Sequence, residues 1–206
     1  MNLSMSRLAV IIGVGALFLV LVLAGTAVLR MGSSGTTSIA TGIATIGGPF
    51  ALTDHNGRAV TQNDFRGRFM LAYFGYTYCP DVCPTTLTTM GDALRELGSA
   101  GNAIVPVFIT VDPKRDTADH LKVYVPYFHP RLVGLTGSAQ QVAAAAKEFR
   151  IYFSKAPDKT APAEDDSYLM DHSAIVYLMG PDGRFLTHFS HGTSVSEMVK
   201  KIRGFL

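Results

Sequence analysis

The chain has 206 residues, 48% of them hydrophobic, and a formal net charge of +2 from 18 basic and 16 acidic residues. Arg7 and Arg30 precede the first acidic residue, Asp54, so residues 31–206 carry 16 charges of each sign. This balance lacks the basic excess typical of nucleic-acid binding. Only two cysteines are present, which excludes a framework of several disulfides.

The N-terminal segment predicts a membrane anchor. Leu8 to Leu29 is a run of 22 residues without a charge, and about 20 apolar residues span a membrane as a helix. A cleaved secretory signal is the alternative, because Gly25-Thr26-Ala27 is an acceptable cleavage site, but its apolar core has only about 7–15 residues. Residues 31–57 contain no Lys or Arg, which favours an N-terminus in the cytoplasm. We therefore predict a single-pass protein of the bacterial inner membrane, with its soluble domain in the periplasm.

We predict three parts for the chain: a membrane anchor in residues 1–30, a flexible linker in 31–47, and one folded domain in 48–206. The linker segment is rich in Gly, Ser and Thr and carries no charge. Such a composition is typical of a flexible tether. The remaining length suits one domain with a substantial core.

Predicted strands and helices alternate along the domain. In chain order the patterns predict a strand at 68–74, a helix at 84–97, a strand at 103–111, a helix at 117–128, a strand at 132–135, a helix at 138–149, a polar surface loop at 155–166, strands at 173–179 and 184–189 around Pro181-Asp182-Gly183, and a helix at 194–205. We expect Asp116 and Ser138 to cap the helices that follow them. This order, with the cysteines after the first central strand, predicts an α/β, thioredoxin-like fold with a mixed central sheet flanked by helices.

The two cysteines lie in the predicted strand-to-helix loop, as Cys79-Pro80-Asp81-Val82-Cys83-Pro84. The nearby helix N-terminus favours thiolates, which are soft ligands for Cu(I), zinc or iron–sulfur clusters. The spacing also permits a disulfide, but a purely structural bridge across so short a loop would add little stability. Metal binding and thiol–disulfide exchange are therefore the two uses that the pair supports.

A third ligand would have to come from elsewhere in the chain. Two thiolates can hold Cu(I), and an imidazole suits copper in both oxidation states. His172 lies in Met170-Asp171-His172-Ser173, before a buried strand and so at a sheet end, where sites form; taken alone, such a histidine is more often structural. Two residues separate His188 from His191, which is a weak metal-binding signal. We expect the remaining histidines in exposed turns or on the surface: His55, His120 and His129.

Residues Tyr73 to Leu87, YFGYTYCPDVCPTTL, resemble the signature of the Sco/SenC family of copper chaperones. Three other stretches resemble family segments and run in the family's order: Gly48-Pro49-Phe50 with Leu52 and Asp54, Ile109-Thr110-Val111-Asp112-Pro113 with Arg115-Asp116-Thr117, and Asp171-His172-Ser173. The resemblance covers residues 48–190 and implies a thioredoxin-like fold with Cys79, Cys83 and His172 as copper ligands. It also implies a role in assembling the binuclear copper centre of cytochrome c oxidase, with the copper-bearing subunit of that enzyme as partner.

A set of two thiolates and one imidazole suits both Cu(I) and Cu(II), because it offers soft sulfur and nitrogen together. Asp171 and Asp81 are candidates for residues behind the ligands that orient His172 or tune the thiolates; the alternative is a solvated carboxylate, which we favour for Asp81. Tyr76 and Tyr78 either form an exposed rim for a partner or anchor the loop.

The alternative function is a thiol–disulfide oxidoreductase that acts on cysteines of a partner protein. Three residues separate the cysteines, not the two of the usual redox motif, and no proline lies between Pro162 and Pro181 to face the pair. A peroxidase would need one activated thiolate near a threonine such as Thr77. We therefore expect a metallochaperone rather than an enzyme, with other periplasmic copper chaperones or thiol reductants as further partners.

Overall fold

The computed structural model describes residues 45–156 and 168–206. The predicted anchor, nearly all of the predicted linker and most of the predicted loop at 155–166 lie outside the described residues. Within those two described ranges, no helix has the length and apolar character needed to cross a membrane.

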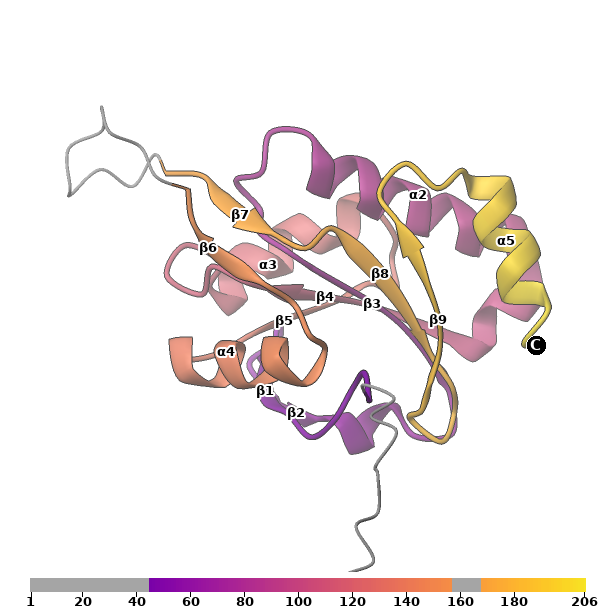
Figure 1. Cartoon of the computed structure of the whole chain (residues 1–206), viewed down its shortest axis with the longest axis horizontal. Helices are drawn as coiled ribbons and strands as arrows, with labels where there is room; N and C mark the ends of the chain where they lie inside the picture. Colours follow the sequence, from indigo (N-terminus) through magenta and orange to yellow (C-terminus); the bar gives the residue numbers. More distant parts are fainter. Residues whose placement is uncertain (1–44, 157–167) are drawn as a thin grey trace, which may run out of the picture. The chain divides into compact units, whose positions relative to one another are not determined.

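A seven-stranded mixed sheet forms the centre of the described structure (Figure 1), in the order β2-β1-β5-β4-β3-β8-β9. Strands β3, β4 and β5 run parallel, whereas β1 and β8 pair with this group in the antiparallel direction. The strands are β1 (Ala51–Asp54), β2 (Ala59–Thr61), β3 (Phe69–Gly75), β4 (Ile104–Thr110), β5 (Val133–Thr136), β8 (Ile175–Met179) and β9 (Phe185–Ser190). A separate two-stranded sheet contains β6 (Phe153–Lys155) and β7 (Met170–His172).

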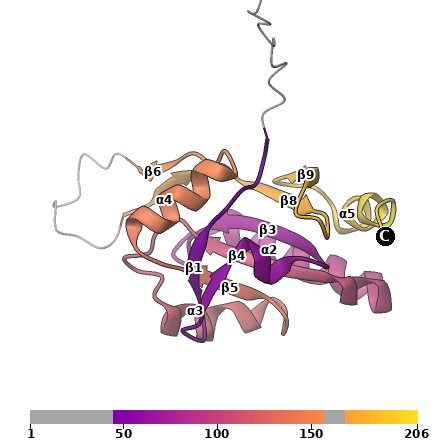
Figure 2. The same ribbon diagram turned by 90° about the horizontal axis from the view of Figure 1, so that it is seen from below.

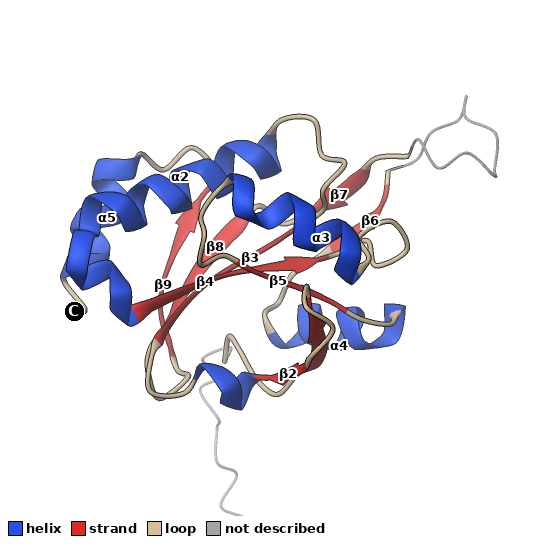
Figure 3. Ribbon diagram, turned by 180° about the vertical axis from the view of Figure 1, so that it is seen from behind, coloured by secondary structure: helices blue, strands red, loops and turns tan. Residues whose placement is uncertain are grey.

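Helices cover both faces of the large sheet. Figures 2 and 3 show α4 on one face and α2, α3 and α5 on the other. The helices are α2 (Val82–Leu97), α3 (Ala118–Tyr124), α4 (Ala139–Glu148) and α5 (Val195–Arg203), with short 3₁₀ helices at η1 (Gln62–Phe65), η2 (Gly98–Ala103) and η3 (Val125–Tyr127). The predicted mixed α/β sheet flanked by helices is therefore confirmed.

The two central strands explain how the sheet positions the cysteine loop. Parallel strands covered on both faces read as continuous apolar runs, and β3 and β4 are buried along almost their whole length. Side chains alternate between the faces of a strand. Phe74 packs against Phe149, at the C-terminal end of α4, with ring centroids 5.2 Å apart. Tyr73 therefore points to the opposite face, where α2 begins.

The predicted N-terminal cap of α4 is confirmed, whereas the predicted cap of α3 is wrong. Ser138 caps α4 as predicted and accepts a hydrogen bond from the backbone N–H of Gln141. Asp116 does not cap α3, because Thr117 takes that position and accepts from the backbone N–H of His120. The helix also ends at Tyr124 and continues as the 3₁₀ turn η3, which contains a proline in its first turn; proline lacks the N–H that would extend an α-helix.

The prediction of a surface position for His129 is wrong. Its side chain is buried, and its Nδ1 accepts a hydrogen bond from the backbone N–H of Arg131.

The β1–β2 hairpin and the short strand β7 were not predicted.

Asp116 instead joins the cysteine loop to the central sheet. It is fully buried, and its carboxylate accepts hydrogen bonds from the backbone N–H and the hydroxyl of Thr77, at 3.1 and 2.6 Å, and from the hydroxyl of Thr110 at 2.6 Å. These contacts fix the start of the loop that carries Cys79.

Replacing Asp116 by alanine should therefore destabilise the protein strongly. Each buried donor left without an acceptor costs about 1–3 kcal/mol, so Asp116→Ala should lower the free energy of unfolding by about 3 kcal/mol or more. Urea denaturation measures the loss, with Asp119→Ala as the matched control because Asp119 is exposed in the first turn of α3. Equal losses in the two variants would contradict this account.

Candidate metal centre

The two cysteines lie on either side of the start of α2. Cys79 is partly exposed in the loop after β3, and Cys83 is fully buried in the first turn of the helix. Both are free thiols. The backbone N–H of Cys83 donates to Cys79 Sγ at 3.4 Å, so the first sulfur receives a hydrogen bond from the helix N-terminus. Gly75 makes room for the pair, because a Cβ at that position would lie 2.8 Å from Cys83 Sγ.

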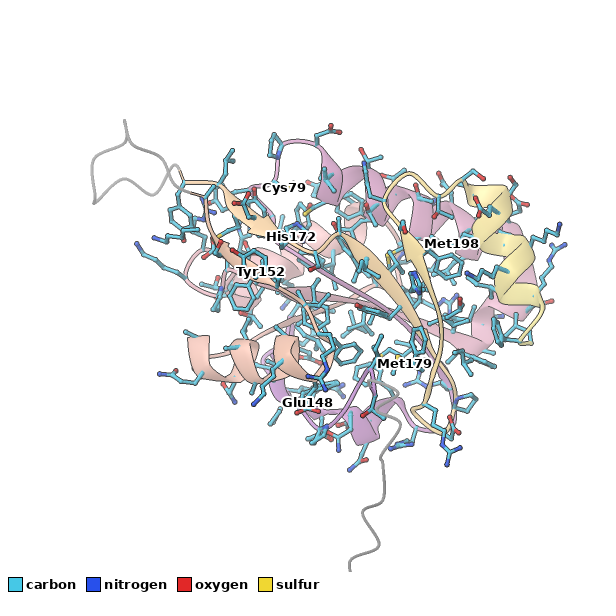
Figure 4. The ribbon with its side chains drawn as sticks, viewed as in Figure 1. Cys79, Glu148, Tyr152, His172, Met179 and Met198 are labelled. Carbon is cyan, nitrogen blue, oxygen red and sulfur yellow. The ribbon has the colours of Figure 1, made fainter. Side chains whose placement is uncertain are left out.

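His172 reaches the cysteines from the last residue of β7. Its Nε2 lies 3.4 Å from Cys83 Sγ, although 89 positions separate the two residues in the sequence. Its Nδ1 lies 3.3 Å from the carbonyl oxygen of Ser173; when Nδ1–H donates there, the lone pair of Nε2 faces the sulfur. Figure 4 shows Cys79 and His172 close together at one end of the sheet.

Two tyrosines hold the imidazole and the buried sulfur. The ring of Tyr76 stands perpendicular to the His172 ring, with centroids 5.9 Å apart, and the Tyr73 ring meets it edge-on at 6.1 Å. The Tyr73 hydroxyl donates to Cys83 Sγ at 3.6 Å. Burial raises the pKa of Tyr73 far above its usual value, so this hydroxyl stays protonated and can donate to a thiolate.

The surroundings of the two cysteines shift their pKa values in opposite directions, so that one is a thiolate and the other a thiol. A hydrogen bond from the Cys83 thiol lowers the pKa of Cys79 to about 5, against the opposing effect of burial and with help from the backbone N–H groups of Asp81 and Cys83. The same interaction, together with burial, raises the pKa of Cys83 well above its usual range. In the reduced, metal-free protein at neutral pH, Cys79 is therefore the nucleophile.

Alkylation of the reduced, metal-free protein should reveal this asymmetry. Because the thiolate is the reactive form, iodoacetamide should modify Cys79 before Cys83. The rate of this reaction should stay constant from neutral pH down to about pH 5 and decrease at lower pH. In Cys83→Ala the donating thiol is gone, so the midpoint of the alkylation rate of Cys79 against pH should rise toward the ordinary thiol pKa of about 8.5. Mass spectrometry after timed quenching gives both the site and the rate. A wild-type midpoint already near 8.5 would exclude the proposed hydrogen bond.

The donor set fits a single copper ion. Ligand atoms that share one small ion at about 2.0–2.3 Å in a tetrahedral arrangement lie about 3.5 Å apart, close to the separation of 3.4 Å between Cys83 Sγ and His172 Nε2. Over residues 45–156 and 168–206, no three Cys, His, Asp or Glu side chains already form a closed ligand group.

The acidic residues near the site face outward. Asp171 is exposed and, by strand alternation, projects from the face of β7 opposite to His172. Asp81 is also exposed and accepts a hydrogen bond from the Thr85 hydroxyl at 3.3 Å. The two tyrosines of the loop differ in role: Tyr76 is buried and contacts His172, whereas Tyr78 is 52% exposed.

The other histidines contact groups other than the cysteine sulfurs, and His191 Nδ1 lies 3.5 Å from the hydroxyl of Thr86 in α2. His188 and His191 are exposed, on β9 and just after it. His55 lies in the turn after β1, where its Nδ1 accepts from the backbone N–H of Gly134. His120 is partly buried rather than on the surface, because its Nε2 contacts the Thr77 hydroxyl at 2.9 Å and its ring stacks on Tyr78.

The sequence assigned no role at the site to three residues that lie around it, namely Tyr73, Arg115 and Tyr168, although Tyr73 and Arg115 belong to segments that resemble the family. A hydroxyl in an otherwise apolar strand could have indicated Tyr73. The buried positions of Arg115 and Tyr168 depend on contacts between distant segments, for which the sequence holds no local signal.

Fold and site together define a thioredoxin-like domain that presents two cysteines and one histidine at one end of its sheet. The sequence model of the SCO1/SenC family matches residues 39–206, and the chain belongs to this family.

Known relatives and structures resemble the same region. The SCO2 homolog of Bos taurus mitochondria is 43% identical over 158 residues, which are 76% of this chain and 58% of that protein; the chain thus spans little more than half of this relative. A SCO2-like protein of Rickettsia felis is 37% identical over 96% of this chain and 93% of its own length. The structure of Bradyrhizobium japonicum ScoI with copper bound is 42% identical, covers 78% of this chain and 99% of that one, and superposes with a TM-score of 0.70.

Proposed function

We propose that this protein binds one copper ion through Cys79, Cys83 and His172, and that it delivers the ion to the binuclear copper centre of cytochrome c oxidase or prepares the cysteines of that centre. The observation that carries the proposal is the approach of His172 Nε2 to Cys83 Sγ beside Cys79. Family membership and the copper-bound ScoI structure support it. The copper-bearing subunit of the oxidase is the proposed partner, and copper is cargo rather than a permanent cofactor.

The three ligands differ in how they take up the ion. Cys79 is the most accessible sulfur and a thiolate at neutral pH, so it meets the incoming ion first. Cys83 is buried and loses its proton on binding, since a thiol must be deprotonated to act as ligand. His172 adds the imidazole nitrogen that allows the site to hold Cu(II) as well as Cu(I).

A thiol–disulfide oxidoreductase is the second candidate, favoured by the reactive thiolate of Cys79 beside a second thiol. In that role Cys79 would attack a partner disulfide, and Cys83 would then resolve the mixed disulfide, so that the partner is reduced and the pair oxidised. The structure gives less support to a peroxidase, because the Thr77 hydroxyl donates to Asp116 and contacts His120.

One experiment separates the two functions. The copper-loaded protein is mixed with the metal-free, reduced copper-bearing domain of the oxidase subunit, and the electron paramagnetic resonance signal of the binuclear centre is followed. In parallel, the metal-free reduced protein is mixed with the oxidised domain, and free thiols are counted. Copper transfer in the first mixture supports the proposal. Failure to bind or transfer copper, together with thiol formation in the second, would exclude copper delivery and leave the preparation of the cysteines by thiol–disulfide exchange.

We also propose that residues 1–30 anchor the protein in a bacterial inner membrane, and that residues 31–47 link the anchor to a periplasmic domain in 48–206. The uncharged run from Leu8 to Leu29 supports the anchor. Alkaline extraction should leave the full-length protein in the membrane fraction and release a variant that starts at Met31. Release of both forms would contradict the anchor.

A further inference from the structure

The hairpin of β6 and β7 carries His172, yet it does not belong to the seven-stranded sheet (Figures 1 and 3). Within the hairpin, His172 pairs with Phe153. Ladder hydrogen bonds therefore fix the histidine to β6 but not to β3 or to the cysteine loop. Side-chain contacts must set the distance between His172 and the two sulfurs.

Arg115, in the loop between β4 and α3, makes polar contacts at the end of this hairpin where the chain enters β7. Its side chain is only 6% exposed, and its Nε forms an ion pair with Asp112, which is 5% exposed. Its Nη1 donates to the backbone carbonyl of Tyr168 at 2.8 Å. The Tyr168 hydroxyl in turn donates to Asp112 Oδ1 at 2.7 Å. We call these three residues, Asp112, Arg115 and Tyr168, the arginine clamp.

The same guanidinium also contacts the cysteine loop. Its central carbon lies 3.7 Å from the ring centroid of Tyr168, 4.6 Å from that of Tyr78 and 5.7 Å from that of Tyr76. Tyr78 is the residue before Cys79. One buried side chain thus touches both the segment that enters β7 and the loop that carries the exposed sulfur.

We propose that Arg115 is a positioning residue for the copper site, which acts through Tyr168 to hold His172 against Cys83. This inference rests on the proposed function and deepens it. Tyr168 lies in the segment that leads into β7 and His172, so loss of its contacts with Arg115 and Asp112 should weaken the state of the site that needs nitrogen. Cu(II) has that requirement, whereas two thiolates satisfy Cu(I).

The role depends on the shape of the guanidinium as well as on its charge. A planar guanidinium donates along several directions and stacks on aromatic rings, whereas an ammonium group is a compact point charge. Arg115→Lys should therefore keep the ion pair with Asp112 but lose the combined contact with Tyr168 and Tyr78. Tyr168→Phe is the milder change, since it removes one hydroxyl and leaves the ring in place.

The test uses the full-length protein, reduced and purified in detergent, with the variants Arg115→Lys and Tyr168→Phe. Tyr152→Phe is the matched control: Tyr152 precedes the same hairpin, is 65% exposed, and its hydroxyl contacts the hydroxyl of Ser154 at 2.9 Å. Competition titrations give the affinity for each oxidation state. Both clamp variants should lose roughly 10–100-fold in Cu(II) affinity, the usual range for residues that orient a ligand, with little change for Cu(I) or in the control.

A double-mutant cycle shows whether the clamp acts through His172. In the His172→Ala background, Tyr168→Phe should cause no further loss of Cu(II) affinity, because coupled residues are not additive. In the metal-free protein, Tyr168→Phe should also speed amide hydrogen exchange in β7 while leaving β3 and β4 unchanged. Equal losses in both backgrounds, or unchanged exchange in β7, would overturn the positioning role.

The outcomes distinguish this inference from the proposed function. If the wild-type protein loses Cu(II) affinity on His172→Ala but not on Tyr168→Phe or Arg115→Lys, only the clamp is wrong. If His172→Ala itself has no effect on copper, the proposed ligand set and the clamp both fall. Should Arg115→Lys fail to fold, Tyr168→Phe still decides the question.

Discussion

Replacing either Cys79 or Cys83 by serine should abolish tight copper binding. Each substitution removes one of two soft sulfur ligands, and the hydroxyl that replaces it is a poor ligand for Cu(I). The buried Cys83 Sγ also holds the contacts to His172 and Tyr73, so its loss removes the centre of the site. Elemental analysis after dialysis against a chelator should show about one copper per wild-type chain and almost none in either variant.

Thr85→Ser is a suitable control for these substitutions, because Thr85 is exposed in the same first turn of α2. It should keep the full copper content. If either cysteine variant retained stoichiometric copper under the same dialysis, the assignment of that sulfur would have to be withdrawn.

His172→Ala should weaken Cu(II) far more than Cu(I). The two thiolates still provide a linear site for Cu(I), whereas Cu(II) prefers a set of ligands that includes nitrogen. Competition titration measures both oxidation states, and the optical bands of thiolate-to-Cu(II) charge transfer report on the site itself. We expect these bands to shift or vanish in the variant, with Cu(I) retained.

Two exposed histidines provide the comparison. His188→Ala should leave the bands unchanged, since this side chain is exposed on β9 and its ring stacks on Phe185. His191→Ala should also leave them unchanged, because its Nδ1 lies against the Thr86 hydroxyl, at 3.5 Å, and not against a sulfur. Asp171→Asn should have a smaller effect than His172→Ala, at most the roughly 10–100-fold of residues behind a ligand, because this carboxylate projects from the other face of β7. Loss of the bands in a His188 or His191 variant, but not in His172→Ala, would show that the third ligand was misassigned.

The sequence predicts the central part of this protein well because its signals there are local. Continuous apolar runs identify β3 and β4, and Ser138 marks the start of α4. The cysteine motif between strand and helix is equally local. The position of His172 at a sheet end follows from the strand after it, but its proposed role as a ligand comes from the family resemblance.

Features that depend on distant contacts escape prediction. Asp116 stands just before a helix, where a capping residue is expected, yet its buried carboxylate accepts hydrogen bonds from the hydroxyls of Thr77 and Thr110. His129 has a neighbouring proline, which suggests a surface turn, yet the fold covers it. Arg115 lies in a segment that resembles the family, but only the folded chain brings Tyr168 onto it. Strands of three residues, such as β2 and β7, are too short to show a period.

X-ray absorption at the copper edge of the loaded full-length protein tests the central claim most directly, because it counts the ligand atoms of the ion. The account predicts one copper per chain, bound by two sulfurs and one imidazole nitrogen in the Cu(II) form, with the nitrogen missing in His172→Ala. A copper shell of oxygen and nitrogen alone, or a spectrum that His172→Ala leaves unchanged, would contradict it.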